Sequence, residues 1–218
     1  MLFLRSLSRI LFFFVCLLLF ACGRSGSEKK ENKESSGVSL SSPQKKKDAG
    51  TVSRDSLLKL SRSILEVLKA KDLRQLSGFI HPAEGLRFSP YAYIDTVSAK
   101  RFTRKVLLNT DLQKEFLWGY YDGSGEPIKL SVSSYFDKFV YDRDFLNAPQ
   151  QQVNIILGQG NSLNNMKELY PSSDFTEFYF PGFKPEYGGM DWVSLRLVFK
   201  KEKSKAYLLA IIHDQWTI

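Results

Sequence analysis

The chain has little cysteine and little histidine, with two residues of each among 218. Cys16 lies inside an apolar run and Cys22 follows its end, so residues 23–218 contain no cysteine. This excludes an intramolecular disulfide, a cysteine nucleophile and a thiolate metal site from that part of the chain. His81 and His213 alone make a poor zinc ligand set, and we expect no metal and no cofactor.

The sequence also lacks a concentration of positive charge on its longest segment. The formal net charge is +8, but residues 54–218 carry 22 basic and 19 acidic residues and are close to balanced. Residues 1–21 and 22–53 hold the rest of the excess. A nucleic-acid binder concentrates positive charge on its folded domain, because phosphate contacts supply most of its affinity. We therefore expect no nucleic-acid partner.

No apolar run is long enough to cross a membrane as a helix. Residues 10–20 (ILFFFVCLLLF) form an uninterrupted apolar run of eleven, whereas a spanning helix needs about 20. Arg5 and Arg9 precede the run without any acidic residue. A basic flank followed by a short apolar core is typical of an export signal, which the sequence predicts over residues 1–21.

The end of this run carries a more specific signal. Leu19-Phe20-Ala21-Cys22-Gly23 resembles a bacterial lipobox, the motif read by lipoprotein signal peptidase, although Phe20 is larger than the residue usual at its position. The resemblance implies a mature chain that begins at acylated Cys22, with the lipid bilayer as its partner and the bacterial cell envelope as its location. It does not distinguish inner from outer membrane. The alternatives are an ordinary signal cut after Ala21 and an incidental cysteine.

Residues 22–53 predict a flexible tether. This segment is dominated by Ser, Lys, Glu and Gly, and Gly23–Ser53 contains only four hydrophobic residues. Such a composition cannot bury enough apolar surface to offset the entropy cost of ordering the backbone.

Residues 54–218 predict one α+β domain. Helices are expected after four capping residues, Ser53, Asp72, Thr103 and Ser131. Strands are expected at residues 87–94, 116–121, 127–130, 153–157, 175–180, 192–200 and 206–217, with a further helix at 162–170. This order predicts N-terminal helices packed on a curved antiparallel sheet that a C-terminal hairpin closes, and it loosely resembles the NTF2-like fold.

The last strand is the most apolar stretch after the signal. Because Ala206–Ile218 would aggregate as an exposed edge, we expect it to be an inner strand paired with residues 192–200. Alternation puts Tyr207, Leu209, Ile211, His213, Gln215 and Thr217 on one face, and Leu208, Ala210, Ile212, Asp214, Trp216 and Ile218 on the other. We expect the second set, apart from Asp214, to face the helices, and His213 and Gln215 to border a ligand pocket.

Several stretches together resemble an uncharacterised domain of bacterial cell-envelope proteins. They are HPAEGLRFSPYAYI, WGYYDGSGEPI, FVYDRDF, GMDWVSLRLVF and IIHDQWTI. The resemblance covers nearly all of residues 53–218 and implies a single domain in the envelope. No established activity or catalytic residue comes with it.

His213 is a weak catalytic candidate. Its neighbour Asp214 would point to the opposite face of the strand and cannot orient it as a triad acid does. His213 would need a distant carboxylate to act as a general base, and the alternative is a partly buried histidine with a backbone partner. His81, which precedes Pro82, is expected to stabilise the last carbonyls of a helix.

Loops and aromatic residues offer further candidates. Asp122–Glu126 lacks the acids of a calcium loop and predicts a turn, and Gly158–Asn161 lacks the third glycine and the lysine of a phosphate loop. Residues 54–218 hold 25 aromatic residues, most of them expected in the core. The candidate ligand-binding set is Trp118, Tyr121, His213 and Gln215.

These observations favour an envelope lipoprotein whose domain binds a protein or a cell-wall polymer without catalysis. One alternative is a periplasmic hydrolase or isomerase with a pocket containing His213 and carboxylates such as Asp191. Another is a structural or surface-exposed lipoprotein. A deep polar pocket around His213 would favour the enzyme, and a shallow aromatic groove would favour binding.

Overall fold

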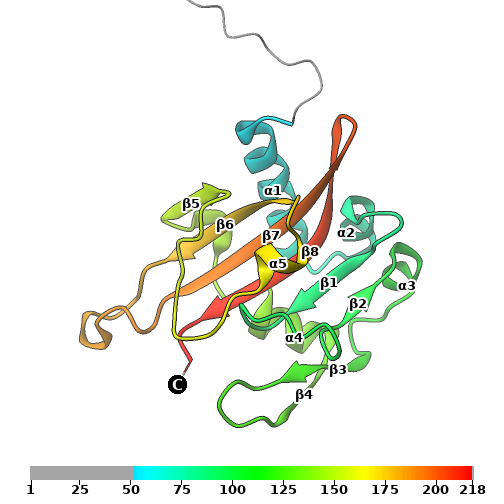
Figure 1. The fold of residues 1–218 in the computed structure, drawn as a ribbon. Helices are drawn as coiled ribbons and strands as arrows, with labels where there is room; N and C mark the ends of the chain where they lie inside the picture. Colours follow the sequence, from blue (N-terminus) through cyan, green and yellow to red (C-terminus); the bar gives the residue numbers. More distant parts are fainter. Residues whose placement is uncertain (1–51, 218) are drawn as a thin grey trace, which may run out of the picture. The chain divides into compact units, whose positions relative to one another are not determined.

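A six-stranded mixed sheet forms the centre of the fold (Figure 1). The computed structural model describes residues 52–217, so the predicted signal peptide and nearly all of the predicted tether lie outside the described residues. The strands follow the order β2-β1-β8-β7-β6-β5, and every neighbouring pair is antiparallel except β1 and β8, which are parallel. Their bounds are β1 Leu86–Ser89, β2 Arg101–Phe102, β5 Gln150–Val153, β6 Asp174–Phe180, β7 Val193–Glu202 and β8 Lys205–Gln215. β3 (Glu115–Tyr120) and β4 (Pro127–Ser131) form a separate two-stranded sheet.

Five α-helices accompany these strands within the described residues. They are α1 Arg54–Lys69, α2 Leu73–Phe79, α3 Arg104–Leu108, α4 Val132–Phe139 and α5 Met166–Leu169, with 3₁₀ turns η1 at Phe145–Asn147 and η2 at Pro185–Tyr187. The first four begin after Ser53, Asp72, Thr103 and Ser131, as predicted, and each cap accepts a hydrogen bond from the backbone N–H three residues ahead. These bonds satisfy an N–H group that the first turn of a helix leaves unpaired. The predicted α+β class is confirmed, and the likeness to the NTF2-like fold stays a prediction.

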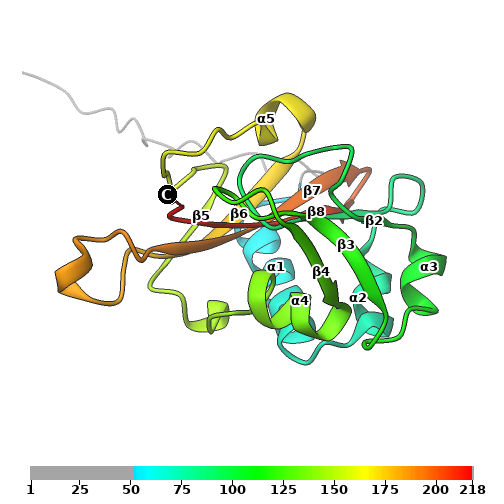
Figure 2. The same cartoon turned by 90° about the horizontal axis from the view of Figure 1, so that it is seen from below.

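The sheet is covered on both faces (Figure 2). Helices α1, α2 and α4 lie on one side of it and α5 on the other. The larger apolar cluster joins α1, α2 and α4 to the sheet, and a smaller cluster joins Ile94 and Met166 to Val198, Ala210 and Ile212. Because both faces are covered, residues 193–199 of β7 and 208–214 of β8 are buried at every position, and most of these residues are apolar. None of the helices within residues 52–217 is long and apolar enough to cross a bilayer.

The C-terminal hairpin is formed as predicted, and β8 is an inner strand between β1 and β7. Its pairing with β7 contains a bulge, because Val198 lies opposite Ala210 whereas Phe199 lies opposite Leu208. Leu209 is therefore the extra residue of β8. One extra residue reverses the alternation of side chains beyond it.

The predicted assignment of faces is consequently wrong beyond the bulge. Ile211 belongs to the helix-side cluster and the His213 ring packs against Phe139 of α4, while Ala210 and Ile212 belong to the cluster on the opposite face. Trp216 follows the end of β8 and is 38% exposed, so it is not the buried residue that the sequence predicted.

Three other segments differ from prediction for local reasons. The first strand ends at Ser89, because Pro90 has no N–H to continue the ladder. The strand predicted at residues 153–157 lies at Gln150–Val153, and Asn154 follows it with a left-handed φ of 60°. The helix predicted at 162–170 has only four residues, since the Asn164 side chain accepts the N–H of Met166 and delays the start of the helix.

Candidate ligand-binding site

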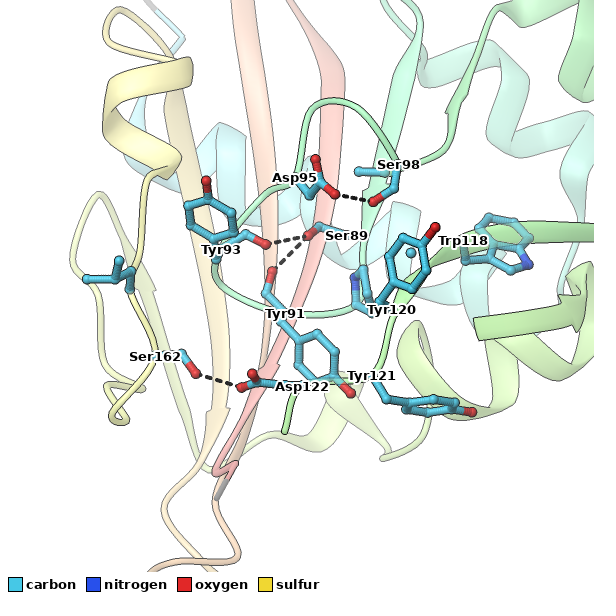
Figure 3. A pocket seen from close by; sticks show the side chains of 14 residues that line it. Ser89, Tyr91, Tyr93, Asp95, Ser98, Trp118, Tyr120, Tyr121, Asp122 and Ser162 are labelled. Atoms are coloured by element: carbon cyan, nitrogen blue, oxygen red, sulfur yellow. Dashed lines mark hydrogen bonds between the residues drawn. The ribbon is translucent and has the colours of Figure 1, made fainter. Parts of the chain in front are cut away.

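A pocket of about 610 Å³ lies between the segment that follows β1, the β3–β4 hairpin and the loop that precedes α5 (Figure 3). Its walls are formed by Ser89, Pro90, Tyr91, Tyr93, Asp95, Ser98, Ala99, Trp118, Gly119, Tyr120, Tyr121, Asp122, Ser162 and Leu163. The volume falls in the range of small-molecule sites, and the lining combines aromatic rings with a few polar groups.

A bulge in β3 turns one of these rings out of the core. Leu117 pairs with Lys129 and Tyr120 pairs with Pro127, so β3 contains one more residue than β4 over this interval. Gly119 lies within the bulge at a φ of 142°, which residues with a side chain rarely adopt. As a result Trp118 is fully buried, whereas Tyr120 is 49% exposed at the pocket.

Tyrosines supply most of the aromatic surface of the pocket. Tyr93 is 53% exposed, and Figure 3 shows its ring and the ring of Tyr120 flanking Ser89. The Ser89 hydroxyl donates to the Tyr91 carbonyl at 2.8 Å, which fixes the turn after β1. Burial raises the pKa of the half-buried Tyr91 phenol, so this hydroxyl is a protonated donor at neutral pH.

Two carboxylates border the pocket, and each is fixed by hydroxyl donors. Asp95 accepts from the Ser98 hydroxyl and from the Val97 N–H, and the Ser98 hydrogen bond in particular lowers the pKa of Asp95. Asp122 accepts from the Ser162 hydroxyl at 3.0 Å and from the Thr217 hydroxyl at 2.6 Å. Among the described residues that line the pocket there is no lysine or arginine. The charge of the lining is therefore negative.

Of the four residues predicted to bind a ligand, two line this pocket. Tyr121 does so half-buried, with its hydroxyl accepting from Lys138 Nζ at 3.0 Å. Trp118 touches the pocket from the core, where its ring stacks on Tyr135 at 3.8 Å and its Nε1 donates to the Leu130 carbonyl. His213 and Gln215 are absent from the lining.

His213 is fully buried beneath the pocket wall. Its Nδ1 lies 3.3 Å from the carbonyl oxygen of Pro90, and its Nε2 lies 3.2 Å from Oδ1 of Asp142. The distant carboxylate that a general base would require is therefore present in Asp142. The imidazole has no exposed surface, however, so it stabilises the packing of α4 against β8 and cannot reach a ligand in the pocket.

Two other predicted polar roles are revised. His81 lies beyond the helix end, where its Nδ1 accepts from the N–H groups of Ala83 and Glu84 and its Nε2 lies 2.8 Å from Glu202. It joins a turn to β7 and does not bind helix carbonyls. The Asp191 carboxylate accepts from the N–H groups at residues 183 and 184, which fixes the β6–β7 connection.

The face of the sheet opposite the helices holds a buried ionic cluster that the sequence did not indicate. Arg196 contacts Asp214 at 2.8 Å and Glu177 at 3.0 Å, and it donates to the Gly158 carbonyl. The N–H groups of Leu157 and Gly158 both donate to Glu177. Burial raises the pKa of Asp214 against the opposing effect of Arg196. The N–H groups at the start of this loop thus already bind an internal carboxylate.

Within residues 52–217 no three His, Cys, Asp or Glu side chains are grouped as a metal ion would require. The chain matches no protein-family model and no curated protein. Sequence reasoning missed Tyr93, Tyr120, Asp95 and Asp122, although the runs Tyr-Ala-Tyr-Ile-Asp and Trp-Gly-Tyr-Tyr-Asp that contain them are unusually rich in tyrosine beside aspartate.

Proposed function

We propose that this domain is a non-catalytic binding module whose tyrosine-lined pocket takes a neutral, hydroxyl-rich ligand such as a saccharide. The observation that supports this proposal is the pairing of the exposed rings of Tyr93 and Tyr120 with the carboxylates of Asp95 and Asp122. Sugars present C–H faces that pack on aromatic rings and hydroxyl groups that donate to carboxylates.

The charge of the pocket further limits the class of ligand that fits it. With two carboxylates and no lysine or arginine among its described lining residues, the site disfavours phosphates, sulfates and acidic polymers. The hydroxyl groups of Ser89, Ser98 and Ser162 add both donors and acceptors. A neutral polyol fits this lining better than an anion.

Binding without catalysis is supported by the state of the polar groups. A hydrolase of the two-carboxylate type needs one carboxyl with a raised pKa to act as an acid. The pKa of Asp95 is lowered instead, by the Ser98 hydrogen bond, and Asp122 is engaged by two hydroxyl donors. His213, the predicted base, is closed off from the pocket.

Tyr120→Ala and Tyr93→Ala test the pocket. In titration calorimetry with soluble N-acetylglucosamine oligomers, each variant should weaken binding roughly threefold to tenfold, because losing an aromatic contact costs about 0.5–1.5 kcal/mol. Tyr187→Ala is the matched control, since Tyr187 is 44% exposed and lies outside the pocket. If no neutral oligosaccharide binds the unaltered protein, or if the three variants weaken binding equally, the proposed ligand class is wrong.

We also propose that acylated Cys22 attaches this module to an envelope membrane, so that residues 22–53 act as its tether. Support comes from the lipobox-like sequence and from the polar composition of the segment that follows it. A flexible chain of this length reaches about 30 Å, which suits a module that searches a cell-wall polymer or a protein partner.

The anchor has a direct test in the intact mass of the native protein. We expect a mature chain that begins at Cys22 and carries acyl groups, and Cys22→Ala should abolish both the modification and the membrane association. An unmodified N-terminus at any other residue would contradict the proposal.

A further inference from the structure

A second pocket, of about 190 Å³, lies beside β1 and β2 and has the opposite charge. Its lining consists of Glu84, Arg87, Thr96, Arg101, Leu169, Tyr170 and Leu209. None of these residues lines the tyrosine pocket. The two pockets are therefore separate sites, and a substitution in the lining of one leaves the lining of the other unchanged.

The two arginines of this pocket lie directly opposite each other. Arg87 of β1 and Arg101 of β2 are cross-strand partners in the antiparallel register, so their side chains leave the same face of the sheet. Like charges at directly opposed positions of a β-ladder destabilise it. A ligand that brings negative charge between them would remove this repulsion.

Nearby carboxylates do not neutralise the pair. Glu84 forms an ion pair with Lys200, Asp174 pairs with Lys201 at 2.6 Å, and Glu202 lies 2.8 Å from His81. Within residues 52–217 neither Arg87 nor Arg101 forms an ion pair with any carboxylate. The hydrogen bond from Lys200 is the largest effect that lowers the pKa of Glu84, and Arg101 adds a smaller one. The hydrogen bond from Ser98 is likewise the largest effect that lowers the pKa of Asp95, and Arg87 adds a smaller one.

Backbone carbonyls hold both guanidinium groups in place. Nη1 of Arg87 donates to the carbonyls of Thr96 at 3.2 Å and Ala99 at 3.3 Å, and Nε of Arg101 donates to the carbonyl of Glu84. Burial raises the pKa of the Tyr170 phenol against the opposing effect of Arg87, and the protonated hydroxyl lies beside the arginines as a further donor. Arginines that are oriented before binding lose less entropy when they form paired hydrogen bonds to an oxyanion.

We propose that this pocket binds a phosphate group, with Arg87 and Arg101 donating to its oxygens and Tyr170 completing the donor set. Planar guanidinium groups match the spacing of phosphate oxygens, and charge-assisted bonds of this kind are the stronger class. The group has two chemical sources, a free phosphate or phosphomonoester and the phosphodiester headgroup of a lipid, and they share this recognition.

The test uses the full chain in a neutral detergent and inorganic phosphate as the first probe. At constant ionic strength, replacing chloride with phosphate should raise the melting temperature, and titration should give a saturable binding curve. Arg101→Gln should weaken phosphate binding roughly tenfold or more, since a hydrogen bond to a charged group contributes about 1.5–3 kcal/mol. Arg74→Gln is the matched control, because Arg74 is exposed on α2 and does not line the pocket.

Further variants separate loss of binding from loss of folding. Arg101 is exposed, so Arg101→Gln should fold, and without phosphate it should melt close to Arg74→Gln, because relief of the like-charge pair offsets the lost hydrogen bond to the Glu84 carbonyl. Tyr170→Phe keeps the ring and should weaken phosphate binding less than Arg101→Gln does. Equal phosphate stabilisation of the unaltered chain and of Arg101→Gln would overturn the proposal.

Glycerophosphoglycerol, a water-soluble phosphodiester headgroup, is the second probe. If both probes bind and Arg101→Gln weakens both, the site recognises a lipid headgroup. If only inorganic phosphate binds, the site recognises a terminal phosphate. Saturable binding of neither probe to the unaltered chain would show that the pocket is not a phosphate site.

Discussion

The position of a histidine in the fold decides what its ring can do. His213 has a carboxylate at Nε2 and a carbonyl oxygen at Nδ1, so an acceptor faces each ring nitrogen and neither nitrogen faces a space that a substrate could occupy. Its side chain is also fully buried, and Phe139 packs edge-on against it. Chemistry requires contact with a substrate, so the same two partners here serve to position α4 and the residue after β1.

Gly119 offers the sharpest test at the scale of one residue. Its φ of 142° is strained for any residue with a side chain, whereas an added Cβ would meet nothing closer than 3.7 Å. Gly119→Ala should therefore lower the free energy of unfolding by roughly 1–3 kcal/mol through backbone strain alone. Urea denaturation of the purified variant and of the unaltered chain measures this loss of unfolding free energy.

Gly78→Ala is the control for this prediction. Gly78 lies in α2, and no atom lies within 4 Å of the Cβ that the substitution would add. Alanine favours helix over glycine by up to about 1 kcal/mol, so this variant should be as stable as the unaltered chain or more so. Equal destabilisation by both variants would mean that the bulge at Gly119 does not require its unusual φ.

At this scale the sequence predicts hydrogen bonds between near neighbours in the chain, but it does not predict which side chains are buried. The caps Ser53, Asp72, Thr103 and Ser131 act on N–H groups three residues away, so their role is visible in the sequence. The exposure of Tyr120 depends on an extra residue in β3 that is defined only by its pairing with β4. The sequence therefore points to Trp118, whereas the ring that is exposed at the pocket belongs to Tyr120.

Among the elements, η1 is connected to α1 by a cluster around one aspartate. Asp144 accepts hydrogen bonds from the Tyr141 hydroxyl at 2.8 Å, the Asn147 amide at 2.6 Å and the Lys69 ammonium of α1 at 3.1 Å. The Tyr141 bond is the largest of the effects that lower the pKa of Asp144 from 3.8 to about 2. These hydrogen bonds are thus stronger when Asp144 is ionised than when it is protonated, so the ionised form stabilises the folded state.

This shift predicts how the stability depends on pH. Because the folded pKa is lower than the unfolded one, the contribution of Asp144 is fully present above 3.8 and is lost as the pH falls toward about 2. Asp144→Asn should be less stable than the unaltered chain at neutral pH, and urea denaturation should show the difference shrinking through this interval. The control is Glu126→Gln, which removes an exposed carboxyl of the β3–β4 turn. A stability difference for Asp144→Asn that stays constant with pH would contradict the assignment.

Strand existence was easier to predict than strand register. The apolar runs that became β7 and β8 are read directly from the sequence, and their inner position follows from their composition. The bulge at Leu209 depends on how two strands fit together, and it moves His213 to the helix side. A single extra residue therefore accounts for the error in the predicted faces.

At the scale of the whole molecule, the two faces of the sheet are stabilised differently. The helix side is an apolar and aromatic cluster that includes Phe88, Trp118 and Tyr135. The opposite side combines a small apolar cluster with the buried contacts of Arg196. The end of β8 contributes to both sides, because His213 and Asp214 point in opposite directions. This makes the C-terminus the segment whose loss should affect the whole described fold.

Two truncations test this expectation. Deleting residues 213–218 removes a buried partner of Asp142 on one face and a partner of Arg196 on the other. Removing one member of a buried ion pair costs about 3–5 kcal/mol, so the truncated chain should lose most of its stability and its cooperative melting transition. Deleting only residues 216–218 removes the partly exposed Trp216 and the hydrogen bond from Thr217 to Asp122, and it should cost roughly 1 kcal/mol. Near-equal melting temperatures for the two truncations would mean that the buried charges of β8 do not stabilise the fold. If deletion of residues 216–218 already caused a large loss of stability, Trp216 would be the residue that stabilises the fold.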